Sequence, residues 1–280
     1  MTQHGAVEGW DGERGEKWKA HIEPLEAMLA PVDAPLIEAL ALHHPVQIAE
    51  IGCGGGMTSA SILRKAPPGS RLRGYDVSQT LINLAADRNA SFGPNAAFVC
   101  ADAQTAQPDA VPFTRLASRF GVMFFENPKT AFRNLAGWLA PEGRFAFAVW
   151  GPPFENKWMY SVKEAVAQVT DWPSPDPDGP GPFRYADADR FVDLLTRSGF
   201  ADVSVSAWNG KLRVGGGMAP ADAANFALSA FSIAEVLADL DQAAKDRAHD
   251  LLRETFASNV TDGQVAMDAR VHIVSGTRAN

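Results

Sequence analysis

The sequence predicts an α/β fold, in which a doubly wound, mostly parallel sheet carries helices on both faces. A short apolar run at residues 46–51 leads into glycines, and further strand-like runs alternate with helix-like segments as far as residue 150. The runs ending at Asp76 and Asp102 also finish on a carboxylate. Since alternating strands and helices are typical of a parallel sheet, we expect these strand ends to share one edge.

The expected elements follow one another along the chain. Residues 13–44 have helical patterning, with Pro35 beginning a second helix that runs through Leu42. Strands are predicted near 46–51, 71–76, 95–101, 112–118 and 143–150, with helices near 57–66, 79–90 and 128–139. A helix at 186–198, ending before Gly199, and a strand at 201–207 come next.

The glycine-containing segment after the first strand predicts a ligand site. It reads Glu50-x-Gly52-x-Gly54-x-Gly56, and glycines let a backbone approach a ligand closely. A dinucleotide fingerprint would need a glycine at position 57, where Met57 stands. A carboxylate at position 50 would repel a pyrophosphate but attract a cation. We therefore expect a nucleotide-like ligand with positive charge, with an NAD(P)-dependent oxidoreductase as an alternative.

Two aspartates at the next strand ends are suited to binding a nucleoside. Asp76 lies 20 residues after Gly56 (76 − 56 = 20), and an acidic residue at the end of a second strand bonds ribose hydroxyls in doubly wound folds. Asp102 ends the third strand, where it is placed to meet an adenine amino group. Three consecutive strand ends thus carry side chains that fit a nucleoside.

From about Val46 to the C-terminus, the chain resembles the class I S-adenosylmethionine-dependent methyltransferases, and within them the bacterial small-molecule group. The likeness rests on the three strand ends, on Ser118-Arg-Phe-Gly-Val-Met-Phe-Phe125 and on Leu139-Ala-Pro-Glu-Gly-Arg144. One departure is Phe113-Thr114, where the group usually has Phe-Asp. The resemblance implies a Rossmann-like sheet whose last strand, near 269–276, is antiparallel at the sheet edge, and S-adenosyl-L-methionine as cofactor.

The resemblance also implies where the cofactor contacts lie. Glu50 and the glycines would surround the methionine part, Asp76 would hold the ribose, and Asp102 with Ala103 would border the adenine. The full expected set is Glu50, Gly52, Cys53, Gly54, Gly56, Asp76, Val77, Asp102, Ala103 and Ser118. We expect a helical segment at 1–45 to cover this site and residues 46–150 to form the cofactor-binding core.

Two further segments are expected to form a cap over the substrate. Residues 151–185 are rich in proline and aromatic residues, which favours a stiff loop, and residues 219–258 form a helical insertion in the remaining core, 186–280. Ligands of open α/β sheets bind outside the carboxyl ends of the strands, where both segments begin. Side chains expected to contact substrate are Phe120, Trp150, Trp158 and Tyr160.

Methyl transfer depends mainly on positioning the nucleophile, so a general base is optional. The candidates for a catalytic role are His21, Arg119 and Glu126. The Asn/Asp-Pro-Pro-aromatic motif of amino-group methyltransferases is missing after strand four, and no carboxylate and amide set for magnesium is evident. We therefore predict metal-independent methylation of an O, N or C atom of a small organic molecule, in secondary metabolism; a non-methylating rearrangement or cyclisation that keeps the cofactor is the alternative.

Composition narrows the partners. The net charge of −8 disfavours nucleic acid, and the two cysteines, Cys53 and Cys100, are too few for a disulfide framework. The first residues have no signal-peptide pattern, and no apolar stretch approaches the roughly 20 residues that span a bilayer. We expect a cytoplasmic enzyme, monomer or homodimer, that acts on a small-molecule acceptor without nucleic acid or membrane partners.

Overall fold

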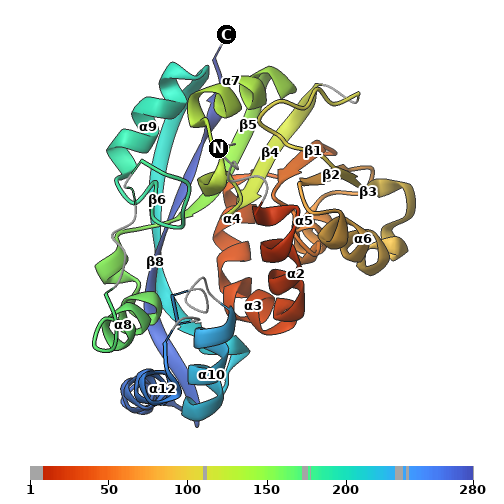
Figure 1. The fold of residues 1–280 in the computed structure, drawn as a ribbon. Coiled ribbons are helices and arrows are strands. Elements are labelled where there is room, and N and C mark those ends of the chain that lie inside the picture. Colours follow the sequence, from red (N-terminus) through yellow and green to blue (C-terminus); the bar gives the residue numbers. More distant parts are fainter. Residues whose placement is uncertain are drawn as a thin grey trace.

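The computed structural model describes residues 9–109, 112–171, 176, 178–230, 236–237 and 240–279, and it contains one large mixed sheet between layers of helices (Figure 1). The strand order is β3-β2-β1-β4-β5-β8-β6, and β7 pairs with β8. Strands β1 to β5 pair in parallel, whereas β8 is antiparallel to both β5 and β6. The predicted doubly wound, mostly parallel fold is confirmed.

The strands have the following bounds: β1 (Gln47–Ile51), β2 (Arg71–Asp76), β3 (Ala96–Cys100), β4 (Phe113–Arg119), β5 (Leu139–Trp150), β6 (Phe200–Arg213), β7 (Val260–Thr261) and β8 (Gln264–Arg278). The helices are α2 (Glu13–Ala20), α3 (Ile22–Leu29), α4 (Asp33–Ala39), α5 (Met57–Lys65), α6 (Gln79–Arg88), α7 (Pro128–Trp138), α8 (Lys157–Val166), α9 (Ala188–Arg197), α10 (Pro220–Ala230) and α12 (Gln242–Ala257). Short 3-10 turns join several of them, including η2 (Ala90–Asn95) and η5 (Val214–Gly216).

Strand register brings the candidate residues of the first three strands to one edge. Glu50 in β1 lies opposite Gly74 in β2 and Ala117 in β4, and Asp76 pairs with Cys100 at the end of β3. The β1 side chains from Ile48 onward are buried, as expected for a parallel strand covered on both faces. The carboxyl ends of β1 to β4 therefore meet beside the glycine turn.

Two groups of helices pack beside the sheet. The N-terminal helices α2, α3 and α4 pack together in front of the sheet, and α8, α10 and α12 gather around the far ends of the long strands β6 and β8 (Figure 1). Helix α3 contacts η5, and α12 contacts both α8 and α10. Because η5 contacts both α3 and α10, it connects the two groups of helices.

Two expectations about the C-terminal half and one about the N-terminal helices need correction. The last strand, β8, is antiparallel as predicted, but it lies between β5 and β6, so β6 forms the edge. Part of the expected stiff loop at 151–185 is a regular helix, α8, which lies between Pro153 and the prolines that begin at Pro173. Residues 172–175 and 177 of that segment lie outside the described residues. The second N-terminal helix, α4, begins at Asp33 and ends at Ala39, earlier at both ends than predicted.

Candidate functional site

The turn after β1 holds its three alternating glycines in left-handed conformations, with φ values of +66° at Gly52, +52° at Gly54 and +79° at Gly56. A Cβ at Gly52 would lie 2.8 Å from the Gly121 Cα, and one at Gly56 would lie 2.5 Å from the Asn89 Nδ2. At Gly54, by contrast, no protein atom comes within 4 Å of a Cβ. Gly52 and Gly56 are therefore required by packing, whereas Gly54 borders open space.

Asp76 is hydrogen-bonded directly to this turn. One carboxylate oxygen accepts from the Gly54 backbone N–H at 2.9 Å, and the other accepts from the Ser78 N–H at 3.0 Å. The two oxygens together have about four acceptor sites, so the carboxylate keeps acceptor capacity for a ligand hydroxyl. Burial raises the pKa of Asp76, while the backbone hydrogen bonds oppose the shift. Asp76 thus shapes the turn and can still accept from a ligand.

Glu50 lies beneath the turn and is almost fully buried. Its carboxylate accepts a hydrogen bond from the Ser59 hydroxyl in α5. Burial raises the pKa of Glu50 to about 8; the Ser59 hydrogen bond and the Arg119 charge oppose this shift, whereas Asp33 and Asp76 add to it. A bound cation would favour the ionised form of Glu50.

Two ion pairs that the sequence did not predict connect the N-terminal helices to the same region. Asp33, at the start of α4, accepts from Arg119 Nη1 at 3.0 Å and from the Thr58 hydroxyl at 3.1 Å. The Asp33 and Arg119 side chains are only 10% and 9% exposed. Glu26 in α3 accepts from Arg88 Nη1 at 2.7 Å, and the same nitrogen lies 3.5 Å from the Gly55 carbonyl oxygen.

Other members of the expected cofactor set support the turn from behind. Ser118 donates to the Ile51 carbonyl at 2.7 Å and accepts from the Gly121 N–H at 3.2 Å, which joins the ends of β1 and β4. The Cys53 side chain is buried. Its Cβ and Sγ atoms each lie 2.9 Å from the position that a Cβ on Gly74 of β2 would take. The structure places the side chains of Cys53 and Ser118 in packing positions rather than in the open space.

The β3 end has a different setting. Asp102 accepts hydrogen bonds from the Gln104 backbone N–H at 2.9 Å and from its side-chain amide. Asp102 and Glu126 both line a cavity of about 470 Å³ beside the start of α7. Ala103 is buried, and Val77 is half-buried with its carbonyl 3.4 Å from the Cys100 sulfur. Asp102 is therefore already engaged by Gln104 in this structure.

Three of the four expected substrate contacts form an aromatic stack. The Phe120 and Trp150 rings lie 4.1 Å apart and nearly parallel, and Trp150 lies 5.2 Å from Trp158. All three are buried, whereas Tyr160 is 40% exposed. Phe120 also has a φ of +65°, a conformation that non-glycine residues adopt at a cost and that occurs often at functional sites. The stack continues from the turn after β4 into α8.

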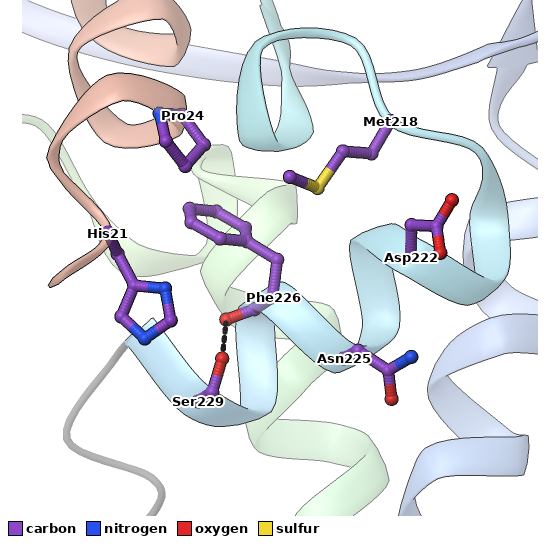
Figure 2. A pocket seen from close by; sticks show the side chains of 7 residues that line it. All are labelled: His21, Pro24, Met218, Asp222, Asn225, Phe226 and Ser229. Atoms are coloured by element: carbon purple, nitrogen blue, oxygen red, sulfur yellow. Dashed lines mark hydrogen bonds between the residues drawn. The ribbon is translucent and has the colours of Figure 1, made fainter.

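The three catalytic candidates are not brought together. The Arg119 side chain is committed to Asp33, and Glu126 is exposed beside α7. His21 precedes α3 and lines a second cavity with residues of α10 (Figure 2). These positions do not form a shared acid–base constellation, so each candidate has a separate environment.

The residues around the turn fit the adenosyl cofactor implied by the fold. The open space at Gly54 is a place that any side chain would fill, and Asp76 retains acceptor capacity beside it. Four buried or half-buried carboxylates, Glu26, Asp33, Glu50 and Asp76, surround the turn with two arginines. This excess of acceptors suits a ligand with hydroxyls and positive charge, and it disfavours a pyrophosphate.

Comparison with known proteins identifies a domain in the part of the chain that carries the glycine turn. A family model described as "Methyltransferase domain" matches residues 48–143, which span β1 through the start of β5. Residues 48–143 are therefore similar to the methyltransferase domain that this model describes, which agrees with the resemblance to class I S-adenosylmethionine-dependent methyltransferases. The matched segment contains the glycine turn, Asp76, Asp102 and the Ser118–Phe125 region, the same residues on which the sequence resemblance rests.

Curated relatives and solved structures that match the chain include other methyltransferases, at identities of 24% or less in the three examples that follow. Over 141 residues the chain is 24% identical to the ubiquinone biosynthesis O-methyltransferase of Coxiella burnetii, covering 50% of this chain and 58% of that protein. The YcgJ protein from Bacillus subtilis superposes with a TM-score of 0.57 at 16% identity, over 90% of this chain and 99% of that one. The Haemonchus contortus phosphoethanolamine N-methyltransferase 2, in complex with S-adenosyl-L-methionine, gives 0.56 at 14% identity, over 99% and 60%. Such structural likeness shows a shared fold.

Replacing Glu50 by glutamine is expected to stabilise the ligand-free protein increasingly between pH 4.5 and 8. The ordinary pKa of a glutamate is 4.5 and that of folded Glu50 is about 8, so the contribution of protonated Glu50 to stability is fully present below pH 4.5 and is lost as pH rises toward 8. Glutamine stays neutral and avoids this loss. Thermal unfolding of both proteins across this range measures the difference; parallel curves would contradict the buried, protonated Glu50.

Proposed function

We propose that this protein transfers a methyl group from S-adenosyl-L-methionine to an O, N or C atom of a small organic molecule. The observation that carries the proposal is the open space at Gly54, bordered by Asp76 and underlain by Glu50. When bound, the cofactor supplies a methyl group on a positively charged sulfur that departs as a neutral thioether. The protein has to bind the cofactor, align its methyl group with the acceptor atom and exclude water.

Each wall of the site is assigned a role in this proposal. Asp76 accepts from the ribose hydroxyls, Glu50 balances the positive charge from beneath the turn, and the Val77, Asp102 and Ala103 region borders the adenine. Helix α2 covers the β2 end: a Cβ at Gly15 would lie 2.6 Å from the Ser78 hydroxyl, and Glu16 accepts a hydrogen bond from Thr80. These contacts support a covering role for the described part of the segment, residues 9–45.

The acceptor is proposed to reach the cofactor beyond β4 and β5, where Phe120 and Trp150 stack. Alignment and exclusion of water provide most of the rate enhancement in such a reaction. A buried aromatic wall supports both, because it is rigid and apolar. We further propose that the reaction is metal-independent, belongs to secondary metabolism and takes place in the cytoplasm, in a monomer or homodimer with no nucleic-acid partner.

Calorimetric titration of the purified protein with S-adenosylmethionine and with NADH tests the cofactor assignment. We expect binding of the first and none of the second. Product masses from a panel of phenols, amines and carbon acids then test methyl transfer, with a gain of one methyl group expected. Consumption of substrate without a change in mass would instead support the rearrangement or cyclisation alternative.

No described helix is both long and apolar enough to cross a membrane.

Replacing Asp76 by alanine is expected to weaken the binding of S-adenosylhomocysteine by about 1.5–3 kcal/mol, the range for hydrogen bonds to a charged group. Asparagine at this position keeps one acceptor oxygen, so Asp76→Asn should weaken the binding of S-adenosylhomocysteine less than Asp76→Ala does. Calorimetry gives both affinities, with Asp87→Ala on the exposed face of α6 as a control for lost charge. Unchanged affinity in folded Asp76→Ala protein would remove this residue from the site.

A further inference from the structure

A cavity of about 640 Å³ lies between the beginning of α3 and helix α10, outside the glycine turn (Figure 2). Its volume falls within the range of small-molecule sites. Pro24, Met218 and Phe226 provide apolar surface. The His21 ring stands edge-on to the Phe226 ring, with centroids 6.0 Å apart and an interplanar angle of 76°. Aromatic and thioether side chains thus line an open hollow between the two helices.

The polar groups of the cavity are one carboxylate, Asp222, and the side chains of His21, Asn225 and Ser229, which can both donate and accept hydrogen bonds. Asp222 and Asn225 are exposed on α10, and Ser229 lies one turn further along this helix. The Ser229 hydroxyl donates to the Phe226 carbonyl at 3.1 Å, so its oxygen remains free to accept (Figure 2). Among the described residues that line the cavity, none is lysine or arginine. This lining favours a positively charged group over a negatively charged one.

Helix α3 is a wall shared by this cavity and the glycine turn. Ile22, next to His21, has its Cδ1 2.4 Å from the position of a Cβ on Gly55. On another side of α3, Ala27 lies 2.8 Å from the corresponding position on Gly216, in the segment that leads to Met218. A molecule in the cavity therefore touches a helix that also contacts the cofactor turn.

We propose that this cavity binds an amphipathic organic cation, with an apolar or aromatic body and a protonated amine, as the part of the methyl acceptor remote from the reacting atom. The acceptor role rests on the proposed function. Phe226 and Met218 contact the body, while Asp222, with the Asn225 amide oxygen one turn along α10, receives the amine. Binding of such a remote group contributes energy for positioning the reacting end. The net charge of −8 attracts a cation as well.

A pair of probes with opposite charge tests the proposal on the full chain in the presence of S-adenosylhomocysteine. Tyramine carries a phenol ring and an amine, and 4-hydroxyphenylacetate carries the same ring and a carboxylate. Ligand-observed NMR and calorimetry should detect tyramine binding and at least tenfold weaker binding of the anion. Equal binding of the two probes, or no tyramine binding, would overturn the proposal.

Variants locate the bound probe. Asp222→Asn, at an exposed position, should weaken tyramine binding at least tenfold, while Asp193→Asn, on the exposed face of α9, should leave it unchanged. Phe226→Leu keeps apolar volume but removes the ring, and should weaken tyramine binding several-fold. An unchanged tyramine affinity in Asp222→Asn would overturn the assignment of this cavity.

The same titrations separate this proposal from the proposed function. Binding of S-adenosylhomocysteine without tyramine binding would overturn the cavity assignment and leave the methyltransferase assignment supported. Tyramine binding that depends on Asp222, in a protein that binds neither S-adenosylmethionine nor S-adenosylhomocysteine, would overturn the methyltransferase assignment and with it the acceptor role. Tyramine and cofactor binding that each respond to their own variants would support both.

Discussion

Replacing Gly54 by valine is expected to abolish binding of S-adenosylmethionine while the protein stays folded. Gly54 has a φ of +52° and no protein atom within 4 Å of a Cβ position. The Cβ of the new side chain therefore meets no protein atom, and the backbone strain is about 1–2 kcal/mol, which a domain with about 5–15 kcal/mol of stability survives. The valine side chain would instead fill the space that we assign to the cofactor.

Gly263→Val is the matched control for this experiment. Gly263 lies in the turn between β7 and β8 and also combines a positive φ of +78° with no atom within 4 Å of a Cβ. Both variants should lose a similar amount of stability in thermal unfolding, but only Gly54→Val should lose cofactor binding by calorimetry. Wild-type affinity in Gly54→Val would exclude this turn as the binding site. Gly52→Ala should destabilise the fold, because its Cβ would lie 2.8 Å from a backbone atom.

The parts of the site that lie within one strand and its turn could be predicted from the sequence. Glycine spacing and a carboxylate at a strand end are local patterns, and the structure places Gly54 and Asp76 in direct contact, as a hydrogen bond of 2.9 Å. The resulting sheet topology follows from the alternation of strands and helices. Local patterns therefore specified both the fold class and the central pair of the site.

Contacts between distant segments could not be predicted in this way. Asp33 and Arg119 are 86 residues apart, and Arg119 alone is consistent with a catalytic, binding or structural role. Glu26 and Arg88 are 62 residues apart, and their ion pair depends on how α3 packs against the glycine turn. No sequence period or motif connects such positions in a single chain.

The position of the last strand and the form of the cap could have been better predicted from their patterns. Strand β8 is buried along most of its length, whereas the middle of β6, residues 204–207, is exposed on both faces, as suits an edge. Trp158 and Tyr160 are two residues apart in a helix, so they point in different directions. A helix in this segment explains why only Trp158 joins the aromatic stack.

Replacing Arg119 by methionine is expected to lower the free energy of unfolding by about 3–5 kcal/mol, because a buried carboxylate then loses its partner. Asp33 would remain buried near Glu50, whose charge interactions already include Asp33 and Asp76. Urea unfolding followed by circular dichroism measures the loss. The matched control is Arg197→Met, which removes an exposed pair with Asp193 and should cost about 0–1 kcal/mol.

The double variant Asp33→Asn/Arg119→Met identifies the cause of this loss. Asparagine keeps an oxygen for the Thr58 hydroxyl but carries no charge, so the double variant should be more stable than Arg119→Met alone. An equal or larger loss in the double variant would mean that Arg119 acts through packing instead. Since Arg119 lies two residues before Gly121, whose Cα is the closest neighbour of a Cβ position on Gly52, loosening the ion pair should also weaken cofactor binding, and the double variant should recover part of that affinity.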